Sequence, residues 1–212
     1  MKKMIVSATL FVGLAIVVIS CSGNFMQDVF NLVSGRATCT IDGEGTREYE
    51  SSVVMYYNET ESPCAIGLAT SMDVDALQSV SDENDLEFPF LVYRIVGSNL
   101  SEGNSFTVNN VLTEEDVADF DYKSLINGEF VGNQLVGVAV SPTKFYIMNS
   151  GTINLTKVKS KKILGNFSGT AYVIDTEATP KLSDKTVSLS GDFKSKVIPM
   201  MGWLSNLQDT IQ

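Results

Sequence analysis

The chain contains one short motif with the spacing of a catalytic pair, Ser141-Pro142-Thr143-Lys144. In a Ser-x-x-Lys arrangement the lysine amine can take the serine proton and activate the hydroxyl as a nucleophile. Pro142 suits a β-turn better than the start of a catalytic helix, and no Lys-Thr-Gly element accompanies the motif. We therefore expect Ser141 and Lys144 to lie in a turn, and we assign no catalytic residue.

Composition limits the other reaction types. The chain has no histidine, which excludes Ser-His-Asp and Cys-His nucleophiles and every histidine-ligated metal site. No Gly-x-Ser-x-Gly elbow, Walker loop or dinucleotide fingerprint occurs, and Gly43-Glu44-Gly45 predicts a hairpin turn. A glycoside hydrolase needs only two carboxylates, so the 25 acidic residues leave that activity open without indicating a pair. We predict no cofactor.

Two acidic segments, 82–87 and 114–121, concentrate oxygen atoms of the kind that bind Ca²⁺. Neither segment has the spacing of an EF-hand loop. Solvated loops and charges at a helix start are the alternative, and we expect that alternative and no metal site. A calcium-stabilised adhesin stays open as a rival function.

Aromatic residues concentrate in the first two thirds of the chain and could line a sugar or peptide groove if several are exposed. We expect them instead to form the apolar faces of strands. The residues concerned are Tyr49, Tyr56, Tyr57, Phe88, Phe90, Tyr93, Phe120 and Tyr122.

The elements that position these groups are expected to form one domain, because 212 residues suit a single core of ordinary size. Hydrophobic residues make up 44% of the chain and charged residues 19%, which excludes a disordered polymer. The formal net charge of −10 argues against a nucleic-acid partner, since phosphate binding depends on lysine and arginine.

The first 20 residues are expected to be a signal peptide. Lys2 and Lys3 precede an apolar run over 4–19, which is short for a membrane span of about 20 residues but fits a signal-peptide core. The run ends in Val18-Ile19-Ser20-Cys21, which resembles the lipobox of bacterial lipoproteins. This resemblance implies cleavage before Cys21, acylation of that cysteine with chains such as palmitate, and anchoring in the cell envelope. Ser22 fits sorting to the outer membrane, in the periplasm or facing the surface.

Two other interpretations of the leader stay open. Ordinary secretion would place Val18 and Ser20 at the cleavage positions and leave Cys21 as a free thiol. Alternatively, the apolar segment is an uncleaved anchor. In each case residues 21–36 follow as a tether or short helix, and residues 37–212 form the β-rich domain.

Cys39 and Cys64 remain as an even pair once Cys21 carries lipid. A disulfide between them would suit an oxidising envelope and would stabilise the fold by about 3–4 kcal/mol. We predict this disulfide, with two separate buried thiols as the alternative.

Short β-rich runs separated by turn residues predict a mainly β fold, an antiparallel β-sandwich or barrel-like domain with short helices. Pro89 is expected to restrict its run to a sheet edge or to force a bulge. The predicted strands cover 38–41, 49–57, 65–70, 88–96, 105–108, 134–140, 144–148, 152–158, 163–174 and 186–197.

Helices are expected in three places. Ser71 can cap a helix over 72–80, and Thr113 with Asp116 makes a partial capping box before Val117. Apolar residues at helical spacing after Pro199 predict a C-terminal amphipathic helix that packs on the sheet.

The last third of the chain has the clearest strand pattern. Residues 163–174 and 186–197 alternate between apolar and polar residues, which indicates strands with one buried and one wet face. Lys159-Ser160-Lys161-Lys162 predicts the hairpin turn between 152–158 and 163–174.

Three segments of this third, 151–156, 163–169 and 187–193, form a Gly-x-Ile-x-Leu-Thr, Ile-x-Gly-x-Phe and Gly-x-Phe series. The series is similar to one found in small all-β lipoproteins of Bacteroidetes-type and related Gram-negative bacteria. The resemblance implies an exported β lipoprotein and transfers no catalytic residue.

Charge is unevenly distributed along the chain. Residues 28–129 contain 20 acidic and 4 basic groups, whereas residues 130–212 contain 5 acidic and 9 basic groups. The wet face of the later strands is therefore expected to be basic and able to meet anionic lipid or polysaccharide. The lysines concerned are Lys157, Lys159, Lys161, Lys162, Lys194 and Lys196.

Taken together, these patterns predict a lipid-anchored envelope protein with a non-enzymatic binding, assembly or structural role. Its partners would be the membrane, through Cys21, and an envelope protein or polysaccharide. A carboxylate-dependent hydrolase is the rival from a different class.

Overall fold

The structure is a computed structural model that describes residues 35–58, 64–72, 87–118, 120, 125, 134–177 and 181–197. All of these belong to one compact unit, Ser34–Gln212. The predicted leader, the tether up to residue 34, most of the predicted helix over 72–80 and the predicted C-terminal helix lie outside the described residues.

Strands make up most of the described chain. The elements are β1 Arg36–Ile41, β2 Gly45–Tyr49, β3 Ser51–Asn58, β4 Cys64–Thr70, β5 Phe90–Val96, β6 Ser105–Asn109, helix α4 Glu114–Ala118, β7 Leu135–Ser141, β8 Lys144–Lys159, β9 Lys162–Asp175 and β10 Lys181–Val197. The prediction of a mainly β fold is confirmed.

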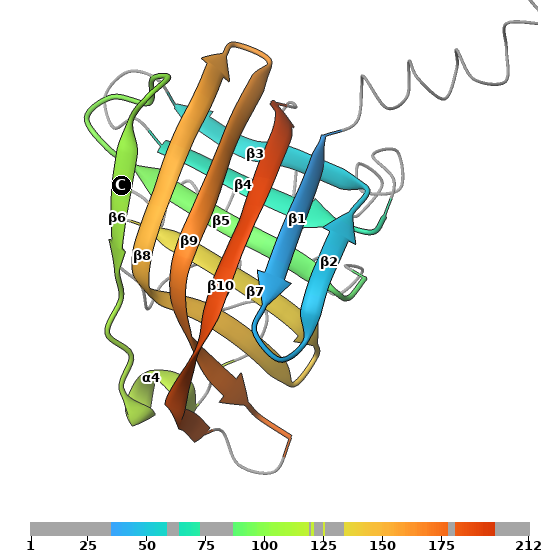
Figure 1. The fold of residues 1–212 in the computed structure, drawn as a ribbon, viewed down its shortest axis with the longest axis vertical. Helices are drawn as coiled ribbons and strands as arrows, with labels where there is room; N and C mark the ends of the chain where they lie inside the picture. The colour runs from blue at the N-terminus through green and yellow to red at the C-terminus, as the bar shows by residue number, and fades with distance from the viewer. Residues whose placement is uncertain are drawn as a thin grey trace, which may run out of the picture. The chain divides into compact units, whose positions relative to one another are not determined.

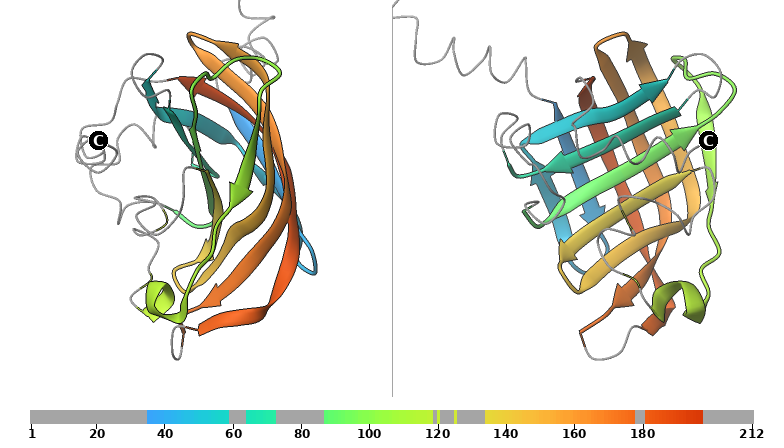
Figure 2. Two further views of the ribbon diagram at one scale, coloured as in Figure 1. Left: turned by 90° about the vertical axis from the view of Figure 1, so that its left-hand side faces the viewer. Right: turned by 180° about the vertical axis from the view of Figure 1, so that it is seen from behind.

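The strands form two layers that cross steeply (Figures 1 and 2). We call β6-β8-β9-β10-β1-β2, in the order of their pairing, the front layer. The back layer consists of β3-β4-β5-β7, also in pairing order. Neighbouring strands are antiparallel except β10 and β3, which pair in parallel through Lys196–Val53 and Val197–Val54.

Two strands belong to both layers and close the sheet into a circuit. The first part of β8 pairs with β7, through Phe145 and Ala139, while its later part pairs with β6. In the same way β10 pairs with β9 and β1 and then reaches β3 at its end. The strands β3, β4, β5, β7, β8, β9 and β10 therefore form the closed, barrel-like arrangement that the sequence predicts.

Most described side chains of the back layer are buried on both of its faces, and this explains its apolar sequence. All seven residues of β4 are buried, with Ile66 and Leu68 in one core cluster and Ala65 and Ala69 in the other. The second cluster also contains Leu189 and Phe193 of β10 and so fills the space between the layers. Strands covered on both faces become continuous apolar runs, whereas strands with one wet face alternate, as β9 and β10 do.

Three strand boundaries differ from the prediction. The predicted strand over 49–57 is two strands, because β2 ends at Tyr49 and β3 begins at Ser51 in the other layer. The prediction that Pro89 marks an edge strand or a bulge is wrong, because β5 begins after it, at Phe90, and lies between β4 and β7.

The third difference concerns β8, which is one continuous strand where the sequence predicts two. A bulge lies between Met148 and Ser150 in its pairing with β9. Gly151 follows with a φ of +155°, and a Cβ on its register partner Gly169 would lie 2.0 Å from the carbonyl oxygen of Ser150. The polar and glycine residues at this point allow β8 and β9 to approach closely and β8 to bend. They therefore mark the point where β8 changes its partner from β7 to β6, and not the end of a strand.

A buried network of hydroxyl groups joins the layers near the parallel pair of β10 and β3. Tyr93 of β5 donates a hydrogen bond to Ser195 of β10 at 2.6 Å, and Ser195 shares a second one with Ser52 of β3 at 2.6 Å. The Tyr93 ring stacks on Phe193 with 4.3 Å between centroids. A Cβ on Gly67 would lie 2.0 Å from this ring, so residue 67 must be glycine for the tyrosine to reach the serine.

We predict that Ser195→Ala destabilises the domain by about 1–3 kcal/mol, because it leaves two buried hydroxyl groups without their common partner. The free energy of unfolding from urea titrations measures this. Ser190→Ala, which removes an exposed serine of the same strand, is the control and should change stability by less than about 0.5 kcal/mol. Equal effects of the two substitutions would contradict the structural role of the network.

Candidate functional site

The Ser-x-x-Lys motif lies in the hairpin between β7 and β8, as the sequence predicts. Ser141 Oγ accepts hydrogen bonds from the backbone N–H of Lys144 at 3.1 Å and of Thr143 at 3.3 Å. The Lys144 ammonium group instead donates to the Glu44 carboxylate. The serine therefore stabilises a turn, and the lysine is engaged elsewhere.

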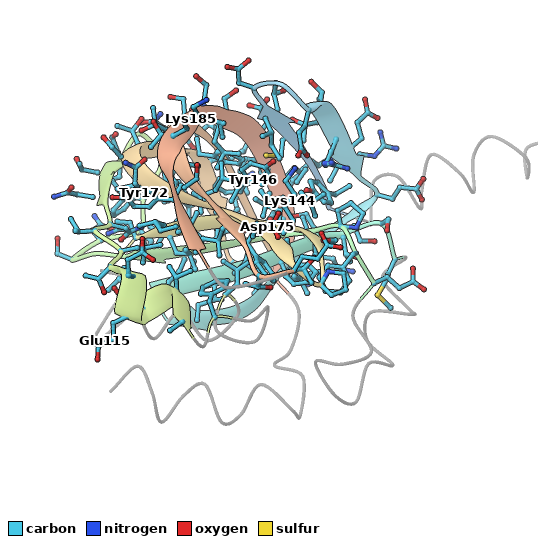
Figure 3. The ribbon with its side chains drawn as sticks, turned by 90° about the horizontal axis from the view of Figure 1, so that it is seen from below. Glu115, Lys144, Tyr146, Tyr172, Asp175 and Lys185 are labelled. Atoms are coloured by element: carbon cyan, nitrogen blue, oxygen red, sulfur yellow. The ribbon has the colours of Figure 1, made fainter. Side chains whose placement is uncertain are left out.

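Glu44 is the centre of a charged cluster that joins two hairpins at one end of the domain. It lies in the turn between β1 and β2, where Gly43 and Gly45 have φ values of +83° and +92°, so the predicted turn is confirmed. Its carboxylate accepts hydrogen bonds from Lys144 and Tyr146 of β8 and from Arg47 of β2, the last at 2.8 Å. Figure 3 shows Lys144 and Tyr146 side by side at this end, seen from below.

The electrostatics of this cluster favour a structural role. Burial raises the pKa of Glu44, but the hydrogen bonds from Lys144, Tyr146 and Arg47 outweigh it and lower the pKa to about 2. The pKa of Lys144 is raised, first by its bond to Glu44, and burial raises the pKa of Tyr146. At neutral pH the carboxylate and the ammonium are thus charged and the phenol is neutral. The pKa values of Glu44, Lys144 and Tyr146 all move away from neutrality, whereas general acid–base catalysis requires a pKa near it.

The acidic segment at 114–121 is partly described and begins a helix. Thr113 donates through its backbone N–H and its hydroxyl to Asp116 at 2.6 and 2.7 Å, and the Asp116 N–H donates back to Thr113 Oγ1. This confirms the predicted capping box and gives Asp116 a structural use. Asp119, Asp121 and residues 82–86 lie outside the described residues. Among the residues that the structure does describe, no three acidic or cysteine side chains gather as metal ligands would.

The expectation that the aromatics belong to the core is confirmed where their side chains are described. Tyr49, Phe90, Tyr93 and Phe120 are buried and Phe88 is half-buried. Among the described residues, Val111 is the large apolar side chain that is exposed. The structure does not describe the side chains of Tyr56, Tyr57 and Tyr122.

The predicted disulfide between Cys39 and Cys64 is wrong. Both thiols are free and buried, and they belong to different core clusters, Cys39 between the layers and Cys64 on the other face of the back layer. Burial raises the pKa of Cys39 to about 12 and that of Cys64 to about 11. An even number of cysteines could not reveal that the two strands direct their side chains into separate clusters. Cys21 lies outside the described residues.

The outward face of the front layer is a broad polar surface, turned toward the viewer in Figure 1. Hydroxyl side chains form one continuous row across its six strands, each the register partner of the next. In order across the layer these are Thr107, Thr152, Ser168, Ser190, Thr40 and Thr46. Thr40 and Thr46 share a hydrogen bond at 2.8 Å, which fixes the edge of this row.

A shallow groove of about 280 Å³ lies beside this row, over β8, β9, β10 and β1. Gly165 leaves a gap in the sheet surface above the Phe193 ring, since a Cβ there would lie 2.4 Å from the ring. The groove is lined by Arg36, Ala37, Thr38, Thr156, Leu164, Gly165, Asp192, Phe193 and Lys194.

The six lysines that the sequence predicts on a basic face gather at one end of the front layer, which we call the basic end. Lys159 and Lys162 are register partners that close the β8–β9 hairpin, and Lys162 is also the partner of Lys196. Lys157, Lys161 and Lys194 complete the group. The lysines are therefore concentrated at the end of the layer next to the groove, which Lys194 also lines, and the rest of the wet face is polar and uncharged for the most part.

Arg36 is the member of this region that the sequence analysis missed. It is the first residue of β1 and the register partner of Lys194. Residue type alone gave no signal, because Arg36 lies in the acidic part of the sequence. Only the pairing of the first strand with the last brings it to the basic end.

Comparison with protein families, with curated proteins and with solved structures finds no match for this chain. Fold and geometry thus define its class, a mainly β, barrel-like domain with a polar front face and one basic end. Within the part of the chain that is described, no helix is long and apolar enough to cross a membrane.

We predict that Glu44→Gln lowers the free energy of unfolding by about 1–2 kcal/mol at pH 7, allowing for solvent screening of the shifted carboxylate. A carboxyl group whose pKa falls from 4.5 to about 2 on folding stabilises the fold fully above pH 4.5, and that stabilisation is lost as the pH falls through 2. The difference between wild type and variant should therefore shrink over this range in urea titrations. Glu102→Gln, at an exposed turn, is the control; a pH-independent difference would contradict the assignment.

We predict that Cys39 and Cys64 do not react with a thiol reagent in the folded protein and both react in denaturant, since burial withholds the reactive thiolate. The mass of the purified protein should not change on reduction. A gain in mass on reduction would show that the purified protein contains a disulfide and would contradict this assignment.

Proposed function

We propose that this chain is a lipid-anchored protein of a bacterial cell envelope with a non-enzymatic binding role, and that the basic end is its binding surface for an anionic partner. Acylation at Cys21 supplies the anchor, supported by the basic start, apolar run and Val18-Ile19-Ser20-Cys21 motif in the correct order. The outer membrane is the proposed location, with Ser22 as the sorting residue.

The gathering of six lysines at one end is the observation that carries the binding role. They come from two segments, 157–162 and 194–196, which the β8–β9 and β9–β10 pairings bring together. From residue 144 to residue 174 the sequence contains no acidic residue, so the acid of the β8–β9 hairpin is Asp175, at the end of the hairpin away from the lysines. A concentrated field of one sign attracts partners of the other sign and speeds their encounter.

The hydrolase receives less support from the site geometry. A glycoside hydrolase needs one carboxyl group whose raised pKa keeps it protonated as the general acid. Glu44 is the carboxylate at the centre of the charged cluster. Its hydrogen bonds from Lys144, Tyr146 and Arg47 lower its pKa to about 2. This carboxylate is suited to holding hairpins together.

We predict that Cys21→Ala releases the protein from the membrane fraction, because two or more acyl chains hold a protein stably at about 0.8 kcal/mol per buried methylene and the variant has none. Fractionation after a high-salt wash measures this, since salt removes proteins held only by charge. Cys39→Ala, which leaves the lipobox intact, is the matched control and should remain in the pellet. Retention of Cys21→Ala after the wash would refute the anchor.

A further inference from the structure

We propose that the basic end docks on the anionic headgroups of the same membrane that holds the acylated Cys21. This inference rests on the proposed anchor and adds the partner and the orientation. The β8–β9 hairpin, at the top of Figure 1, then lies against the bilayer, and the β1–β2 and β7–β8 hairpins at the other end point away from it.

The lysines form a surface patch that is compact and accessible. Lys157, Lys159 and Lys161 are exposed, and Lys162, Lys194 and Lys196 are half-buried. The pairings Lys159–Lys162 and Lys162–Lys196 place charges on three adjacent strands. Such a patch matches a plane of lipid phosphates, which offers several anions at once.

All six members of the patch are lysines, so their charges repel one another. Burial lowers the pKa of Lys162, and the neighbouring charges of Lys194, Lys157 and Lys159 lower it further. Asp192, the acidic residue nearest on β10, lies two residues before Lys194 and lines the groove. An anionic surface placed against the patch would offset the repulsion between these lysines.

The position of the tether selects the membrane as the occupant. The chain enters the described domain at Gly35 and Arg36, and Arg36 pairs with Lys194 of the basic end. Only about 15 residues separate Cys21 from Arg36, which span at most about 50 Å when fully extended. A short tether attached at the basic end keeps the lysines at a high effective concentration next to the headgroups.

Range and strength of the attraction agree with this placement. Screening limits the attraction to about 8 Å at physiological salt, so the lysines act only when they are held near the surface. Each lysine close to an anionic leaflet strengthens association about five-fold.

The test uses the lipidated protein carrying Ser160→Cys in the β8–β9 turn, purified from membranes and labelled there with a fluorophore. Cys39 and Cys64 are buried and do not compete for the label. The protein is reconstituted into vesicles of phosphatidylcholine alone or of phosphatidylcholine with phosphatidylglycerol, both containing a headgroup quencher. Lys159→Glu/Lys161→Glu reverses the patch at two hairpin positions. Lys185→Glu is the matched control, exposed near the other end of the front layer and labelled in Figure 3.

Docking predicts strong quenching on anionic vesicles only, which weakens with added salt. The double variant should fall to the level of neutral vesicles, and Lys185→Glu should behave as the wild type. Equal quenching on both vesicle types, or equal loss in both variants, would overturn the proposal. So would salt-sensitive binding of a soluble anionic polysaccharide without quenching on anionic vesicles.

Flotation separates this result from the proposed function. If the anchor exists, the protein floats with neutral vesicles at high salt, whether or not the hairpin label is quenched. Failure to float under those conditions refutes the anchor, while failure of quenching in a protein that floats refutes docking alone.

Discussion

The domain depends on two long strands that each pair with both layers. β8 leaves β7 and continues along β6, and β10 leaves β1 and ends against β3. Because a strand cannot end between layers without exposing unpaired backbone groups, each needs a local device at its crossing point. For β8 the device is the bulge and the contact of Gly151 with Gly169. For β10 it is the buried bond from Tyr93 to Ser195, which Gly67 permits.

The same two strands determine where charge collects. Side chains alternate along a strand, so a long strand with one buried face presents its polar residues as a row on the other. β8 and β10 each contribute lysines near their final residues, and β9 runs antiparallel to both. The lysines of all three strands must therefore meet at one end, even though Lys157 and Lys194 are far apart in sequence.

Sequence patterns predicted what depends on local periodicity and failed where a choice between layers was needed. The alternation in 163–174 and 186–197 and the turns at Gly43 and Ser160 all appear in the structure. The split between β2 and β3 was not predictable, because both are strands and only the layer changes. The cysteine pairing failed for the same reason, since Cys39 and Cys64 are both buried strand residues of different clusters. The sequence predicts a basic face from its lysines, but their concentration at one end depends on the strand register, which the sequence does not reveal.

The two charged regions of the domain differ in whether contacts within the protein stabilise their charge. At one end the Glu44 carboxylate has three donors within the protein, and its lowered pKa shows that the fold stabilises its charge. At the other end the charge of Lys162 is disfavoured by burial and by its lysine neighbours. Uncharged polar side chains would serve the exposed hairpin equally well and would remove the repulsion, so stability does not account for the lysines. The proposed docking on membrane headgroups would account for them, because the chain that follows the proposed anchor at Cys21 enters the domain at this end.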